Sequence, residues 1–411
     1  MPLRWIPQSR VSMQRVGMLP IAVAAASERR PVTFERAARD FARVVQREMS
    51  VPSEHLGQFS TYVNSLRLWK RYRHLQERAI TSKDRVEIQD LWLADPALPA
   101  ATGAITPEVV EDIPQLAANL RLIRPQNYTR TDRGRALLAS LSEECRAVTE
   151  GSSGAIAPNP LAPPLGAQLL LLYALLEADG DFVRAVYKPA PLFEEEFTRP
   201  DFTDRLDGVC QELARLYRPR MRTGQDRKLL LRLQEWASEI ERPRQTGSKW
   251  GGGRPPEQLG TLRLEPYVDL GLVTRRSRYA YRYALSEQQR GFFNGLAAVE
   301  EVEEFLHGAL VGAWCEARGE HRTRLSSEQA WPFIVSAYKE IRSPLGQASF
   351  VEVALLAIGT LLESHPDQYF EIADGIEAIT NQRRRNPKGV RLGVNRRGAL
   401  TYMKIQGAGN E

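Results

Sequence analysis

The feature that most constrains the fold is a series of secondary-structure elements that the sequence predicts twice along the chain. Within residues 106–141, apolar residues first recur at the spacing of an amphipathic helix, which Thr106 can cap. A short apolar step follows, and then a turn at residues 125–127. The chain can return as a short strand and enter a last helix, with Thr131 or Asp132 as its N-cap. The predicted order is helix, strand, turn, strand, helix.

The second copy spans residues 256–293. Its helix closes on "DLGLV", which matches "NLRLI" in the first copy, and Ser286 stands where Thr131 or Asp132 stood. Between them, apolar and aromatic residues alternate with polar ones, a pattern typical of a β-strand: Tyr279, Tyr281, Tyr283 and Leu285. The recurrence predicts two distant copies of one supersecondary unit.

The stretch "ANLRLIRPQNYTRTDRGRALL" resembles the end of bacterial winged helix-turn-helix domains. A third unit is expected near the C-terminus, where two helices in residues 349–382 precede candidate strands at 390–394 and 399–405. The resemblance implies a mainly α, multi-domain chain of tandem winged-helix-like units, with short β-hairpins as wings.

Changes in composition predict the domain boundaries within the 411 residues. The clearest boundary is a linker rich in Gly, Ser and Pro. The expected segments are a basic N-terminal arm (1–32), a first unit with N-terminal helices (33–148), the linker (149–164), a second unit with a helical insertion (165–296) and a helical C-terminal domain with a basic tail (297–411).

In a winged helix, the helix before the hairpin normally enters the major groove of DNA, and the hairpin contacts adjacent phosphates. For the second unit, the resemblance implies Arg263 on that helix and a basic wing formed by Arg275, Arg276, Arg278 and Arg282. The corresponding helix of the first unit carries Glu108, Glu111 and Asp112, which would repel phosphates. We therefore expect the first unit to be structural or protein-binding.

Two further basic segments are candidate phosphate contacts. The loop 249–254 places glycines between Lys249, Trp250 and Arg254, so its amides could hold a phosphate while the indole stacks; a flexible connector is the alternative. The tail is the other segment, with Arg383, Arg384, Arg385, Lys388, Arg391, Arg396 and Arg397. Phosphate binding and a solvated tail are both compatible with this pattern.

Charge and cysteine content narrow the class of protein. The net charge is +6, and 48 of the 56 basic residues are Arg, which suits phosphate contact or reflects codon usage. Three separated cysteines and five scattered histidines give no zinc-site or disulfide pattern, so we expect a cytoplasmic protein without metal or cofactor. No segment has the roughly 20 apolar residues of a membrane span. Residues 1–30 fit an arm, an over-long gene start or a targeting segment.

Catalytic motifs are weak. The best carboxylate cluster is Glu194, Glu195, Glu196, Asp201 and Asp204, whose consecutive glutamates point in different directions on any regular element. We therefore expect a non-catalytic subunit that binds nucleic acid, most simply double-stranded DNA, within a larger bacterial DNA-transacting or anti-phage defence complex. A winged-helix scaffold that binds only protein is the first alternative, and a metal-dependent nuclease is the second.

Overall fold

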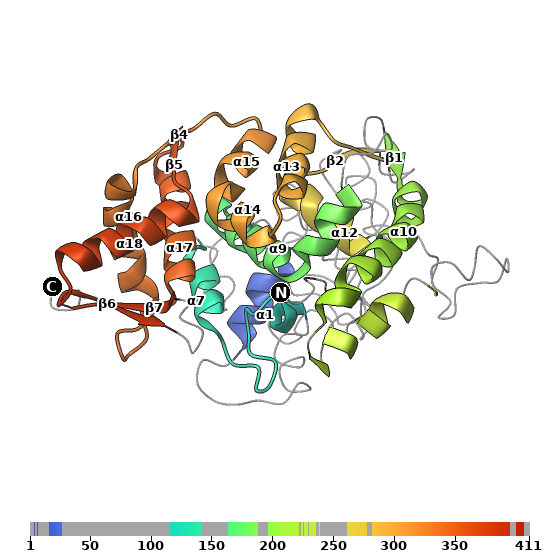
Figure 1. Cartoon of the computed structure of the whole chain (residues 1–411). Helices are drawn as coiled ribbons and strands as arrows, with labels where there is room; N and C mark the ends of the chain where they lie inside the picture. Colours follow the sequence, from blue (N-terminus) through green and yellow to red (C-terminus); the bar gives the residue numbers. More distant parts are fainter. Residues whose placement is uncertain are drawn as a thin grey trace, which may run out of the picture.

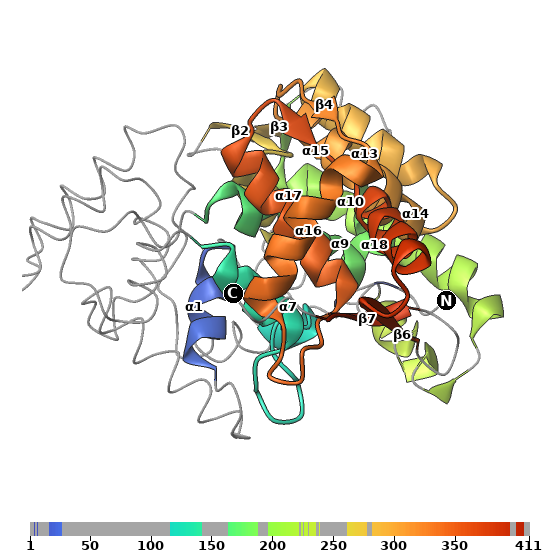
Figure 2. The same ribbon diagram turned by 90° about the vertical axis from the view of Figure 1, so that its left-hand side faces the viewer.

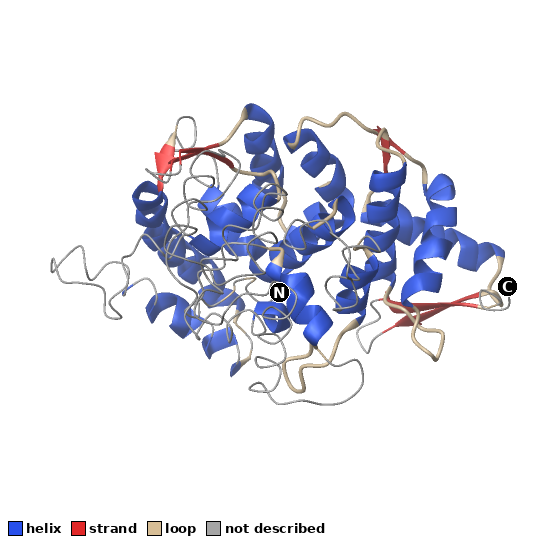
Figure 3. Ribbon diagram, turned by 180° about the vertical axis from the view of Figure 1, so that it is seen from behind, coloured by secondary structure: helices blue, strands red, loops and turns tan. Residues whose placement is uncertain are grey.

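The computed structural model shows a mainly helical protein with small sheets at its edges (Figures 1 and 3). The residues that it describes are 4, 6, 16–26, 116–141, 163–187, 196–221, 223, 224, 226–228, 230–235, 238, 261–277, 282–394 and 400–406. The helices predicted within residues 33–115 and the glycine-rich loop 249–254 lie outside these ranges, as does most of the predicted linker.

Helix α9 (Leu165–Tyr187) lies at the centre of the molecule (Figures 1 and 2). Most of its residues are buried. Around it pack α7 (Asp132–Ala139), α10 (Arg199–Tyr217), α13 (Glu287–Ala298), α14 (Val302–Gly308) and α17 (Phe350–Ser364). Because neighbours surround α9, its sequence is apolar on every side rather than along one stripe. Among the described residues, no helix is both long and apolar enough to cross a bilayer.

The sequence predicts that this apolar helix ends at Asp179–Gly180, but it continues to Tyr187. Asp179 and Asp181 do not stop the helix because their carboxylates accept hydrogen bonds from the N-terminal segment. Asp179 accepts the Ile6 N–H at 2.7 Å, and Asp181 accepts the Arg4 N–H at 2.9 Å. A long-range partner therefore lets a turn-like sequence remain helical.

The two predicted copies share their local backbone geometry. In the first, the Leu122 and Ile123 amides both donate to the Ala117 carbonyl, at 2.8 and 3.4 Å; in the second, Leu272 and Val273 donate to the Tyr267 carbonyl, at 2.8 and 3.1 Å. The residue before each pair is left-handed, with φ of 58° at Arg121 and 75° at Gly271. In each copy, a residue with a left-handed backbone therefore ends the helix, and an extended segment follows it.

The last helix of each copy begins at a predicted cap. The side chain of Thr131 accepts the Gly134 N–H at the start of α7, and Ser286 forms a capping box with Gln289 at the start of α13. Ile123 and Arg130 form an antiparallel bridge in the first copy, which confirms the predicted return of the chain.

The second unit has a three-stranded antiparallel sheet. After α9 come β1 (Phe197–Thr198), α10 and a 3-10 turn η3 (Arg218–Arg220); α12 (Thr261–Asp269), β2 (Thr274–Ser277), β3 (Arg282–Ala284) and α13 follow. The strands lie in the order β1–β3–β2, so the first strand pairs with the last.

Among its described residues, the C-terminal unit has two two-stranded sheets, one parallel and one antiparallel. Beyond α15 (Leu310–Ala317) come β4 (Thr323–Arg324), α16 (Ser327–Ile341), α17, β5 (Gln368–Tyr369), α18 (Ile372–Arg385), β6 (Val390–Val394) and β7 (Leu400–Ile405). The strands β4 and β5 pair in parallel, and β6 and β7 form the predicted antiparallel hairpin. Ala348, between α16 and α17, forms an antiparallel bridge with Met403 of β7. The extended residue between α16 and α17 therefore pairs with the last strand.

The described part of the N-terminal segment is not a free basic arm. Helix α1 (Met18–Ala25) packs on α7, and Leu19 and Val23 are fully buried. The Arg130 guanidinium donates to the Val23 and Ala24 carbonyls at 2.9 and 2.6 Å. Within the predicted basic arm 1–32, the apolar side chains of residues 16–26 therefore complete the core beside the first unit.

Candidate nucleic-acid interface

Arg263 cannot contact nucleic acid in this structure. Its side chain is fully buried, donates to Asp179 at 2.9 Å and reaches the Ile6 carbonyl at 3.2 Å. Burial raises the pKa of Asp179 to about 6, while the Arg263 charge and the Ile6 N–H oppose the rise. The predicted DNA contact of Arg263 is contradicted. The sequence gives no sign of its partner, because Asp179 lies 84 positions away.

Arg275 is also internal. It forms an ion pair with Glu265 of α12, and both side chains are buried. The Tyr283 hydroxyl of β3 donates to the same carboxylate at 2.7 Å. Arg275 therefore joins the sheet to α12 instead of lining an exposed wing, and this prediction is wrong as well.

Two wing residues of the second unit remain on the surface. Arg276 is exposed, and Arg282 is 56% exposed and 3.7 Å from Glu196. However, residues 263–267 of α12 are buried, and this described part of the helix presents no free face that could enter a groove. Arg278, Lys249, Trp250 and Arg254 lie outside the described residues.

A group of exposed cations lies at the C-terminal unit. Arg383, Arg384 and Arg385 form the last turn of α18 and are all exposed. Lys388 and Arg391 follow them in the chain, and both are exposed. Figure 1 shows the end of α18 and the β6–β7 hairpin at the same edge of the molecule. Arg396 and Arg397 of the hairpin turn lie outside the described residues.

An exposed ion pair lies at this basic end. Glu328 lies 2.5 Å from Arg385, but the two side chains are 66% and 62% exposed, and such pairs are worth little. No Asp or Glu occurs between positions 378 and 410 of the sequence. Cations in the last turn of α18 are also favoured by the partial negative charge at the end of a helix. The result is an exposed, positively charged surface.

The first turn of α18 is acidic, and its carboxylates have structural partners. Asp374 receives two hydrogen bonds from Arg324, at 2.8 and 2.9 Å, and completes a capping box with Glu371. Glu371 is buried and accepts the Val311 and Gly312 N–H groups of α15, at 3.0 and 2.8 Å. Burial raises the pKa of Glu371, and these two donors oppose the rise. Helix α18 therefore carries negative charge in its first turn and positive charge in its last turn.

The β6–β7 hairpin has one inner and one outer face. Val390 and Met403 are buried on the inner face, where β6 contacts α18 and β7 contacts α17. Arg391 pairs with Lys404 across the outer face. The sequence reasoning missed Lys404 and its neighbour Tyr402, although the alternation in residues 400–405 places both on that face.

A second cluster of charges lies in the interior. Arg133 of α7 binds Glu177 of α9 at 2.7 Å and Glu352 of α17 at 3.0 Å, and it lies over the Tyr173 ring. Burial would raise the pKa of Glu177, but the charge and hydrogen bond of Arg133, together with the charges of Arg121 and Arg4, outweigh burial and lower it. Burial also raises the pKa of Tyr173. These groups link α7, α9 and α17 in the interior, so we assign them a structural role.

Two carboxylates of the acidic cluster that was considered for metal catalysis have other partners in the structure. Asp201 forms the capping box of α10 with Thr198, and Glu196 lies beside Arg282. Glu194 and Glu195 lie outside the described residues. Within the part of the chain that the structure describes, no group of three or more His, Cys, Asp or Glu side chains is placed to hold a metal ion.

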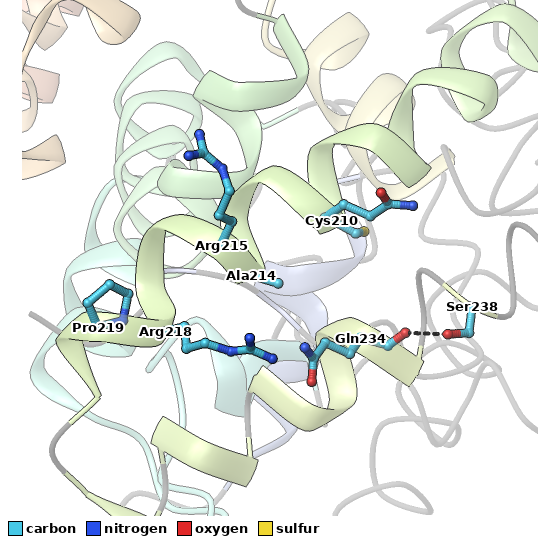
Figure 4. A pocket seen from close by; sticks show the side chains of 8 residues that line it. Cys210, Ala214, Arg215, Arg218, Pro219, Gln234 and Ser238 are labelled. Atoms are coloured by element: carbon cyan, nitrogen blue, oxygen red, sulfur yellow. Dashed lines mark hydrogen bonds between the residues drawn. The ribbon is translucent and has the colours of Figure 1, made fainter.

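A pocket of about 470 Å³ lies beside α10 (Figure 4). Arg218 and Gln234 point toward one another across it, while Arg215 points away (Figure 4). The described lining residues include two guanidinium groups and no carboxylate: Cys210, Gln211, Ala214, Arg215, Arg218, Pro219, Gln234 and Ser238. They offer anion contacts but no acid–base pair.

Comparison of the chain with protein-family models, curated proteins and solved structures found no match. The chemistry of the exposed basic end is therefore the basis for assigning a function.

Proposed function

We propose that this protein is a non-catalytic nucleic-acid-binding subunit of a larger bacterial DNA-transacting or defence assembly, and that its C-terminal unit contacts the nucleic acid. The observation that carries the proposal is the exposed run Arg383–Arg385, continued by Lys388 and Arg391. Arginine forks bind phosphate oxygens bidentately, and such contacts supply most of the affinity for nucleic acid that does not depend on sequence.

We further propose that the second and C-terminal units are winged helices. Each contains a helix, an extended segment, two further helices and two strands, with an insertion before α12 in the second unit and the short strand β5 between α17 and α18 in the C-terminal unit. In each, an extended segment between two helices pairs with the last strand. The buried α12 gives the second unit a structural role, whereas α18 and its hairpin give the C-terminal unit an exposed basic end. The proposed contact therefore differs from the one that the sequence favoured.

The test is fluorescence anisotropy with a labelled DNA duplex over a series of salt concentrations. We expect micromolar or tighter binding at low salt, with affinity that falls as salt rises. The double variant Arg383→Ser, Arg384→Ser should bind more weakly, and the slope of log affinity against log salt should fall by about 2, roughly one for each phosphate contact.

The matched control is Arg227→Ser, Lys228→Ser, which removes the same charge from two exposed positions elsewhere on the surface. Arg276→Ser tests the wing of the second unit separately. Equal losses in the control and in the Arg383, Arg384 variant would indicate a net-charge effect and refute a localised site. Absence of binding by the wild type at low salt, both to the duplex and to a duplex with a single-stranded overhang, would refute the proposal.

A protein-binding scaffold is the alternative function that a specific observation favours. Leu345 and Val394 are 73% and 58% exposed, and Val394 belongs to the same hairpin as Arg391. Large apolar side chains on a surface suit a protein partner. In that case Val394→Ser would abolish co-purification of a partner, while binding of the duplex would be absent or insensitive to Arg383 and Arg384.

A further inference from the structure

An aromatic ring lies on the outer face of the β6–β7 hairpin. Tyr402 of β7 is the cross-strand partner of Gly393 of β6. A Cβ atom at position 393 would overlap the Tyr402 ring, so the ring lies across the strand where a side chain would otherwise stand. The Tyr402 side chain covers Gly393, which is buried, and is itself 38% exposed. Glycine at 393 therefore permits the ring to lie on the hairpin.

Two cations share this face with the ring. Arg391 and Lys404 are the adjacent cross-strand pair, and strand alternation places them on the same side as Gly393 and Tyr402. Arg391 is exposed, and the Lys404 ammonium is held beside the strand by donating to the Leu345 carbonyl at 3.0 Å. The outer face thus combines one aromatic ring with two positive groups.

This combination matches single-stranded nucleic acid better than a continuous duplex. Unpaired bases stack on aromatic side chains while their phosphates are held by nearby cations. Reading a duplex would require α18 to enter the major groove, but its first turn carries Asp374, and Glu377 is exposed one turn later. The basic residues gather at the opposite end of α18, beside the hairpin.

We propose that Tyr402 is a stacking platform for an unpaired base, with Arg391 on the adjoining phosphate. The preferred ligand would then be nucleic acid with a single-stranded segment, such as a duplex with an overhang, whose duplex phosphates lie against the end of α18. This inference rests on the proposed function and specifies which nucleic acid the surface selects.

The test uses DNA with 2-aminopurine, whose fluorescence falls when it stacks on an aromatic ring, in a single-stranded overhang or in the duplex. We expect the wild type to quench the overhang probe and to leave the duplex probe unchanged. Tyr402→Phe should behave as the wild type. Tyr402→Leu should lose the quenching and bind the overhang about 5- to 100-fold more weakly, the range for loss of one base–aromatic stack.

The experiment separates this inference from the proposed function. Salt-dependent binding with no quenching by the wild type, or equal quenching by Tyr402→Leu, would overturn the stacking platform and retain the nucleic-acid interface. No binding of either DNA would overturn both. The ring could instead serve only to cover Gly393, in which case Tyr402→Leu would lower the thermal midpoint but leave affinity for the overhang unchanged in the folded protein. That result would also reject the proposal.

Discussion

At the scale of single residues, Arg133 is a buried charge that joins three helices of the interior. Its guanidinium is 5% exposed and joins α9 and α17 through Glu177 and Glu352. Replacement by Met would keep much of the volume but leave two enclosed carboxylates without this cation. We expect Arg133→Met to lower the free energy of unfolding by about 3–5 kcal/mol at neutral pH, as measured by urea denaturation.

The effect should depend on pH. In the wild type the pKa of Glu177 is lowered below its usual 4.5, so its ionisation stabilises the fold above that value, and the stabilisation is lost as pH falls through the folded-state pKa. In Arg133→Met burial acts without its main opposing charge, so acid should favour folding instead. The difference between the two proteins should narrow below pH 4.5, and adding Glu177→Gln should partly rescue the variant. A difference independent of pH would contradict the role of Arg133 as a counter-ion.

At the scale of elements, local chemistry was readable from the sequence. The caps at Thr131 and Ser286 and the C-terminal hairpin were predicted because each depends on neighbours within a few positions. The exposure of Arg263 and Arg275 was predicted wrongly because a basic side chain carries no local sign of a distant acid. The sequence located the basic end after α18, but only cross-strand register places Tyr402 over Gly393.

The turn that ends α12 gives a test at this scale. Gly271 has φ of 75°, and a Cβ there would lie 3.2 Å from the Arg318 side chain. We expect Gly271→Ala to destabilise the protein by about 1–2 kcal/mol, because a left-handed backbone is unfavourable for a residue with a Cβ. The control is Gly291→Ala in α13, where nothing lies within 4 Å of the added atom. It should stabilise by up to about 1 kcal/mol through helix propensity. Thermal denaturation of both variants measures these opposite changes in stability. An equal change in both variants would contradict the prediction.

At the scale of the whole molecule, α9 makes the units one structure. The C-terminal α17 crosses it so closely that a Cβ on Gly359 would lie 2.7 Å from the Gly166 Cα. Glu363 of α17 accepts the Gly166 N–H at 2.9 Å beside this crossing. Backbone cannot yield as a flexible side chain can, so Gly359→Ala must separate the two helices. Such overpacking costs about 1–3 kcal/mol.

If α9 couples the units, the destabilisation caused by Gly359→Ala will not be confined to the C-terminal unit. Hydrogen exchange of Gly359→Ala should be faster by a similar factor, about 5- to 100-fold, in the slowest amides of both α18 and α13, because those amides exchange through global unfolding. Gly308→Ala is the control, since nothing lies within 4 Å of its added atom. Faster exchange confined to residues 327–405 would instead show that the C-terminal unit unfolds independently. A nucleic acid bound at its basic end would then stabilise that unit alone, whereas a coupled molecule would transmit the stabilisation through α17 and α9 to the second unit.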